Sequence, residues 1–140
     1  MALSKIDADG VTGLQETLTA TTTVPSEGGA VTTNLVQGLA KAWMCFNGRN
    51  TSSILDSFNY SSMVDNGVGQ YTLTLTNAMN NSNYSHSGIS GWGTTSLICI
   101  ALANNSNPAT TTVARYSVTY ANGSTFDSDK NNTKLHGDLA

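Results

Sequence analysis

Charged side chains are scarce in this sequence. Lys, Arg, Asp and Glu make up 11% of its 140 residues, whereas soluble domains typically carry roughly 25%. The six basic residues are scattered and the formal net charge is -3. Because phosphate binding requires clustered Lys and Arg, we expect no nucleic-acid partner. Solubility must then depend on neutral polar side chains, and Asn, Ser and Thr are abundant.

Long apolar runs are missing as well. No run reaches the roughly 18 apolar residues that a membrane helix needs, and the opening sequence MALSK does not begin a signal peptide. We therefore expect no membrane insertion and synthesis in a cytosol without export by that route. The length suits one domain that is large enough to bury a core and fold without disulfides.

Cysteine occurs twice, at Cys45 and Cys99. Each lies in an apolar run, residues 43–46 and 97–102, where a free cysteine behaves as a small apolar side chain. We expect two buried, structural thiols that are reduced, because a cytosolic assembly route keeps thiols reduced. A disulfide stays possible if the two strands are neighbours, since connectivity cannot be read from a sequence.

Groups for catalysis are few. The two histidines, His86 and His136, are the only side chains with an ordinary pKa near neutrality, and no Gly-x-Ser-x-Gly elbow occurs. Apart from two close pairs, the carboxylates are scattered and suggest no acid and base facing each other in a cleft. We therefore predict that the protein is not an enzyme and uses no cofactor.

One spacing suggests a calcium-binding loop, but the neighbouring residues do not fit such a loop. Asp127, Asp129 and Asn131 follow the D-x-D-x-N pattern. Asn132 stands where the loop requires glycine, and two lysines, Lys130 and Lys134, would lie beside the cation. A surface turn leading into a strand is the better interpretation, and no metal site is predicted.

What the sequence does contain is a series of short strands. In residues 58–75 the sequence Asp65-Asn66-Gly67 tolerates positive φ, and Tyr71, Leu73 and Leu75 alternate with threonines, so a half-buried hairpin is predicted. Further strands are expected at residues 43–46, 52–55, 84–89, 97–102, 116–120 and 133–136, with Asn47-Gly48 as the turn between the first two. Such spacing predicts an all-β fold, a β-sandwich or jelly roll. The predicted core residues are Tyr71, Leu73, Leu75, Ile98, Ile100, Tyr116 and Val118.

The first 37 residues differ from the rest. They are rich in threonine and carry spaced apolar side chains that are too few to form a core, so residues 1–37 are predicted to form an extended N-terminal anchoring arm and residues 38–140 the head. A helix of at most two turns is expected after Asn34, the candidate N-cap. We expect the arm to bind other chains through Leu3, Ile6, Val11, Leu14 and Leu18.

One group of residues could bind a sugar. Trp92 lies between Gly91 and Gly93, and an exposed indole could stack on a sugar ring held by Asn and Ser side chains. The candidate glycan contacts are Trp92, His86 and Asn83, and the alternative for His86 is a polar residue of a loop or strand face. The simpler alternative is a tryptophan in the core or in a subunit interface. The Asn-x-Ser/Thr triplets carry no weight as glycosylation sites in a chain this rich in Asn, Ser and Thr.

Several runs resemble a module that recurs in virion proteins of tailed bacteriophages. They are residues 40–48, 56–72, 78–79 and 83–84, together with the ending at residues 127–129 and 136–138. The likeness covers roughly residues 32–140 and is strongest to fibre-like and tail-fibre proteins of marine phages that infect cyanobacteria and other aquatic bacteria. In long fibres the module follows an extended shaft, whereas only the arm precedes it in this sequence.

The resemblance implies a non-enzymatic structural role in the virion, after assembly in the cytoplasm of the bacterial host. Because no shaft precedes the head, a short fibre or capsid decoration protein is expected. The alternative is a receptor-binding, lectin-like fibre tip that recognises a host surface glycan. Phage fibres of this kind are usually three-fold, so a homotrimer bound to other capsid or tail proteins is expected.

Overall fold

The computed structural model describes residues 23–25, 32–91, 98–102 and 108–140, and the side chains of residues 23–25, 32–34, 37 and 98–102 lie outside the description. The chain divides into two units, residues 1–39 and residues 40–140. In the first unit, strands β1 (Thr23–Pro25) and β2 (Thr32–Asn34) pair antiparallel, and the helical turn α2 covers Leu35–Gly38. The short helix expected after Asn34 is therefore a single turn.

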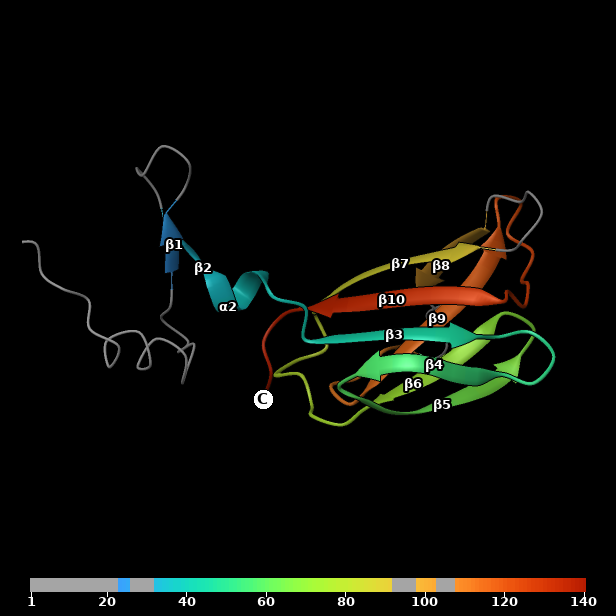
Figure 1. The fold of residues 1–140 in the computed structure, drawn as a ribbon, viewed down its shortest axis with the longest axis horizontal. Coiled ribbons are helices and arrows are strands. Elements are labelled where there is room, and N and C mark those ends of the chain that lie inside the picture. The colour runs from blue at the N-terminus through green and yellow to red at the C-terminus, as the bar shows by residue number, and fades with distance from the viewer. Residues whose placement is uncertain (1–22, 26–31, 92–97, 103–107) are drawn as a thin grey trace, which may run out of the picture. The chain divides into compact units, whose positions relative to one another are not determined.

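The second unit, called the head below, is a sandwich of two antiparallel sheets (Figure 1). One sheet has the order β4-β3-β10-β7 and the other the order β5-β6-β9-β8. The all-β class predicted from the sequence is confirmed. The strands of the first sheet are β3 (Ala42–Asn47), β4 (Ser53–Phe58), β7 (Ser85–Gly91) and β10 (Lys130–His136). Those of the second are β5 (Tyr60–Gly67), β6 (Gln70–Leu75), β8 (Ile98–Leu102) and β9 (Val113–Tyr120).

The core lies between the sheets and follows from the alternation of side chains along the strands. In β6 every second residue is buried, and β3, β9 and β10 alternate in the same way. Phe46 of one sheet meets Tyr71 of the other edge to face, with ring centroids 4.9 Å apart. Five predicted core residues are confirmed, each at most 5% exposed: Tyr71, Leu73, Leu75, Tyr116 and Val118. The side chains of Ile98 and Ile100 lie outside the described residues.

Two predicted turns are wrong in position. The β5–β6 hairpin turns at Val68 and Gly69, because β5 continues through Gly67. Asp65 Oδ1 accepts a hydrogen bond from Gly67 N at 2.9 Å, and Gly69 has a φ of +65°. Between β3 and β4 the chain uses residues 48–52 in place of a two-residue turn.

Strands β4 and β5 follow each other through one residue but belong to different sheets. That residue is Asn59, with a φ of +58°, a value that Asn tolerates better than most residues. Asn59 Oδ1 accepts hydrogen bonds from N and Nδ2 of Asn77, at 2.8 and 3.0 Å, and its Nδ2 donates to Lys41 O at 3.0 Å. The bend thus closes one side of the sandwich and is held by a side chain.

Replacing this residue tests the bend. Asn59→Ala removes the side-chain hydrogen bonds and puts a less tolerant residue at positive φ, so we expect the free energy of unfolding to fall by about 2 kcal/mol. Chemical denaturation measures the change. Asn50, also at φ +58°, is the matched control because its side chain makes no such set of hydrogen bonds within the described residues. A loss at Asn59 no larger than that of Asn50→Ala would contradict the clamping role.

A polar network is buried near one end of the first sheet. Asn131, which is fully buried, accepts a hydrogen bond from Ser90 Oγ at 2.6 Å and donates through Nδ2 to Ser128 O at 3.0 Å. Ser128 Oγ in turn donates to Gly91 O at 2.5 Å. These bonds fix the connection between β9 and β10 against β7, because buried polar groups are costly when unpaired.

Within the described part of the chain, no helix has the length and apolar character needed to cross a membrane.

Candidate functional site

A groove lies on the outer face of the sheet β5-β6-β9-β8, over β6 and β9. The inward residues of these strands form the core, so their alternate residues must face outward. Antiparallel pairing places Gln70 directly opposite Ser117 and Thr72 directly opposite Arg115. The two strands therefore supply a row of polar side chains.

The segment after β9 extends this surface. Tyr120 N donates to Ser124 O at 2.9 Å and Phe126 N donates to Val118 O at 3.0 Å, so the chain turns back and pairs with the end of β9. Gly123, with a φ of +85°, allows the turn. Thr125 then pairs with Thr119. The result is a continuation of the sheet beyond the end of β6.

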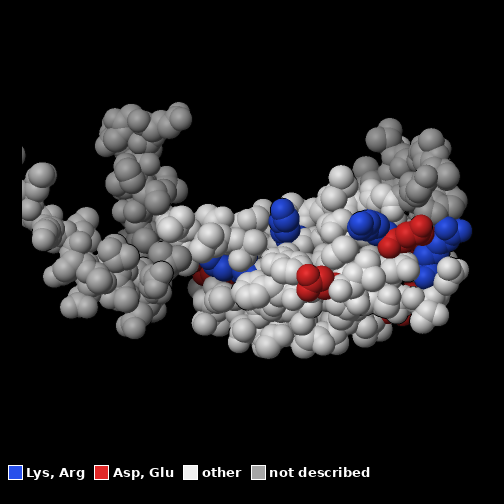
Figure 2. Space-filling view, in the orientation of Figure 1, with Lys and Arg blue, Asp and Glu red and all other residues white. Residues whose placement is uncertain are grey.

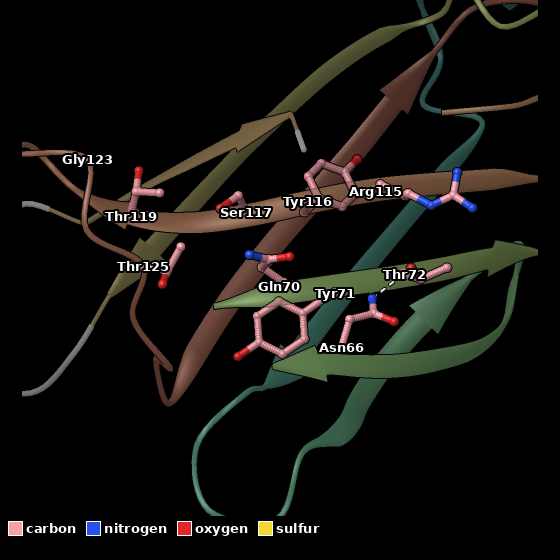
Figure 3. A pocket seen from close by; sticks show the side chains of 10 residues that line it. All are labelled: Asn66, Gln70, Tyr71, Thr72, Arg115, Tyr116, Ser117, Thr119, Gly123 and Thr125. Atoms are coloured by element: carbon pink, nitrogen blue, oxygen red, sulfur yellow. Dashed lines mark hydrogen bonds between the residues drawn. The ribbon is translucent and has the colours of Figure 1, made fainter. Parts of the chain in front are cut away.

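The groove encloses about 330 Å³ and its lining is almost entirely uncharged (Figure 3). Asn66 Nδ2 donates to Thr72 Oγ1 at 2.8 Å, which orients the amide of Asn66. Amides and hydroxyl groups dominate, and each of them can both donate and accept hydrogen bonds. The lining residues are Asn66, Gln70, Tyr71, Thr72, Arg115, Tyr116, Ser117, Thr119, Gly123 and Thr125.

Arg115 is the one charged residue among those that line the groove. Its Nη1 donates to the carbonyl oxygen of Pro108, and its Nε is buried without a hydrogen-bond partner among the described residues. In Figure 3 the guanidinium lies beyond Thr72, while Gly123 and Thr125 lie at the opposite end of the labelled set. The groove therefore has one cationic end and one neutral end.

The head carries few charged side chains, and their charges balance. Residues 40–140 contain five basic and five acidic side chains, so the head is neutral overall. Figure 2 shows charged side chains scattered over a mostly uncharged face. Arg49 and Asp129 form an exposed ion pair at 3.5 Å. Such exposed pairs contribute little to stability, and this one lies outside the groove.

His86, predicted to bind a sugar, faces the interior of the sandwich. It pairs with the buried Leu135, its Nδ1 lies 3.3 Å from Tyr116 Oη, and its ring centroid is 4.6 Å from that of Tyr84. Burial lowers the pKa of His86. The structure thus gives His86 a place among core aromatic side chains, away from the exposed position expected for a glycan contact.

Three hydroxyl groups lie near one another in the same interior. Burial raises the pKa of Tyr116 to about 12, although the neighbouring hydroxyl groups of Tyr60 and Thr133 act in the opposite direction. Burial also raises the pKa of Tyr60. The hydroxyls of Tyr60 and Thr133 form no hydrogen bond of good geometry within the described residues. The core around His86 therefore contains polar groups, but its burial disfavours the charged form of His86.

Stability should depend on the protonation of His86. The pKa of His86 lies below 6.5 in the folded protein and near 6.5 in the unfolded chain, so the unfolded chain binds the proton more readily. We expect the melting temperature to be constant above about pH 7 and to fall as the pH decreases through about 6.5. Thermal unfolding followed at pH 7.5 to 5.5 measures this.

The matched variants are His86→Gln, which should flatten the profile, and His136→Gln, which should keep it. If the His86→Gln profile retained the full slope, another group would be responsible for the pH dependence.

The other predicted sugar contacts are only partly described. Asn83 is exposed in the loop before β7, where its N donates to Asn81 Oδ1 at 2.8 Å. Trp92 lies outside the described residues. The arm residues Leu3, Ile6, Val11, Leu14 and Leu18 lie outside them as well. The glycan contacts at Asn83 and Trp92, and the anchoring role of the arm, stay predictions.

The three residues of the calcium-like spacing have different partners. Asp127 Oδ1 accepts hydrogen bonds from Gly69 N at 2.6 Å and from Tyr71 Oη at 2.9 Å. Burial, and then the hydrogen bond with Asp127, raise the pKa of Tyr71. Asp129 pairs with Arg49, and Asn131 belongs to the buried network. Asp127 thereby fixes the hairpin turn against the β9–β10 connection.

Cys45 has a free thiol and is half-buried. It lies opposite Asp56 and Asn132 in the neighbouring strands, on the alternate face from the buried Met44 and Phe46. The buried position expected for this thiol is therefore corrected to the outer face of the sheet. The side chain of Cys99 lies outside the described residues, and the reduced state of both thiols stays a prediction.

Sequence reasoning did not identify the groove. From the sequence, the threonines of β6 are only the polar half of an alternating strand, and residues 116–120 are only one more expected strand. Long-range pairing decides that β6 and β9 are neighbours. It also decides that residues 124–126 fold back beside β9. The available signal is the polarity of the outward side chains of β6 and β9, and these strands are separated in the sequence by β7 and β8.

Comparison of the chain with known protein families, with curated proteins and with solved structures gives no match.

Proposed function

We propose that this chain is a non-enzymatic structural protein of a bacteriophage virion, either a short fibre or a capsid decoration protein. Residues 1–37 anchor it to the particle, and the β-sandwich head is displayed. The resemblance of residues 32–140 to fibre-like virion proteins motivates the proposal. The structural observation that supports it best is that the chain joins the head at one end.

The start and the end of the head are adjacent. Lys41 N donates to Leu135 O at 2.8 Å, and Ala42 pairs with Leu135. In Figure 1 the C-terminus lies at the end of the sandwich where β3 begins. Turns at residues 48–52, 68–69 and 121–129 lie at the other end of their strands. A head connected at one end and exposing turns at the other is suited to display.

Association into a homotrimer and with other virion proteins is part of the proposal. Three-fold symmetry comes from the resemblance. Association itself is supported by large apolar side chains that are exposed on the head, among them Leu55, Phe58 and Ile89, which are 53 to 67% exposed. Light scattering on the purified protein should give three times 14.6 kDa, and a mass of 14.6 kDa would contradict self-association.

Locating the protein in intact particles tests the structural role. Purified virions are analysed by mass spectrometry and labelled with gold-conjugated antibodies against the head. Label over the capsid supports a decoration protein, and label at the tail supports a fibre. Absence of the protein from purified virions would refute the proposal.

The groove favours a second function, receptor binding through a host surface glycan. Its supporting observation is the concave, neutral lining of amides and hydroxyl groups, which matches the hydroxyl groups of sugars. A glycan array and an adsorption assay with host cells test it. A protein that serves only as a decoration binds neither glycans nor cells.

A further inference from the structure

We infer that the groove over β6 and β9 is a site for an acidic saccharide, whose carboxylate is bound by Arg115. This inference rests on the second function proposed above, glycan binding, and adds the class of glycan and the residue that selects it. It places the site on the outer face of the second sheet, and it involves neither Trp92 nor His86.

The neutral part of the groove suits the hydroxyl groups of a sugar. Gln70 lies directly opposite Ser117, and Thr119 pairs with Thr125 beyond the end of β6. Each of these side chains can donate and accept, as each sugar hydroxyl can. The amide of Asn66 is oriented by its bond to Thr72, which reduces the ordering needed on binding.

The cationic end suits a carboxylate. A guanidinium can bind a carboxylate through two parallel hydrogen bonds, and such charge-assisted bonds are stronger than neutral ones. Within the described part of the chain, the Arg115 side chain donates to a neutral carbonyl, that of Pro108, and the lining of the groove contains no acidic residue. Asp127, the nearest acid along the chain after β9, accepts hydrogen bonds from Gly69 and Tyr71.

The position of the groove favours a saccharide over a peptide. Peptides that bind sheets commonly add a strand at an edge, where backbone groups are unpaired. β6 lies between β5 and β9, and β9 lies between β6 and β8, so both strands are paired on each side. Only side chains are offered to a ligand here, and the outward ones are polar.

The test compares matched acidic and neutral sugars. Oligomers of hexuronic acids and their carboxyl-reduced forms are titrated against the full chain by calorimetry. We expect at least tenfold tighter binding of the acidic form. Arg115→Gln should remove this preference, Arg115→Lys should leave part of it, and Arg49→Gln, which changes an arginine outside the groove, should leave it unchanged.

A second variant tests the groove without removing its charge. Ser117→Tyr fills the space beside Gln70 and should weaken binding of every sugar, and melting curves of all variants show whether they fold. Equal binding of acidic and reduced oligomers would overturn the inference while glycan binding survived. Binding of no saccharide would refute both. Preference for hexaglutamate over all sugars, lost in Arg115→Gln, would overturn it in favour of a peptide site.

Discussion

Gly69→Ala should destabilise the head by about 2–5 kcal/mol. A Cβ at this position would lie 2.5 Å from Val118 O and 2.6 Å from Phe126 N, and both are backbone atoms that cannot move aside as a side chain does. Such overpacking costs about 1–3 kcal/mol, and the left-handed φ of +65° costs a further 1–2 kcal/mol or so. Gly69 also connects three elements, because its N–H donates to Asp127 and its carbonyl accepts from Val118 N.

Urea denaturation of the variant measures this loss. Gly123→Ala is the matched control, since Gly123 has a φ of +85° but open space around its Cα. It should lose only about 1–2 kcal/mol, the cost of the backbone conformation alone. Equal losses in the two variants would show that the contacts with Val118 and Phe126 do not matter.

Leu73→Ala should cost about 2–5 kcal/mol. Leu73 is fully buried at the centre of β6, opposite Ala114 of β9, and its removal leaves a cavity that the surrounding strands can fill only in part. The midpoint of thermal unfolding should decrease accordingly.

The neighbouring Thr74 provides the comparison for Leu73. It faces outward on the same strand and is half-buried, so Thr74→Ala should change stability by no more than about 0.5 kcal/mol. An unchanged melting curve for Leu73→Ala, or a larger loss for Thr74→Ala, would mean that the register of β6 is wrong.

The strands and the core could be predicted because they depend on local alternation. Tyr71, Leu73 and Leu75 are apolar at every second position, and this period alone places them on one face. The turn of the hairpin was misplaced because Asp65-Asn66-Gly67 and Val68-Gly69 both carry glycine. Only the contacts of Gly69 with Val118 and Asp127 decide between them, and those partners are distant in sequence.

The change of sheet at Asn59 could not be predicted. Residues 53–67 have no break typical of a turn, and the deciding interactions are with Lys41 and Asn77, each 18 positions away. The groove is hidden for the same reason, because its walls come from β5, β6, β9 and the segment that follows β9. His86 was misjudged because an isolated polar residue in a weak strand gives no sign of which face it occupies.

The hydrogen bond between Lys41 and Leu135 has a practical consequence for protein engineering. Because the first and last strands of the head are neighbours and antiparallel, both connections to a carrier protein would leave from the same end of the head, so residues 40–140 could be placed in a surface loop. Short linkers would suffice, and the carrier would hold the graft by two covalent connections. The groove with Arg115 would remain uncovered, since it lies on the outer face of the other sheet.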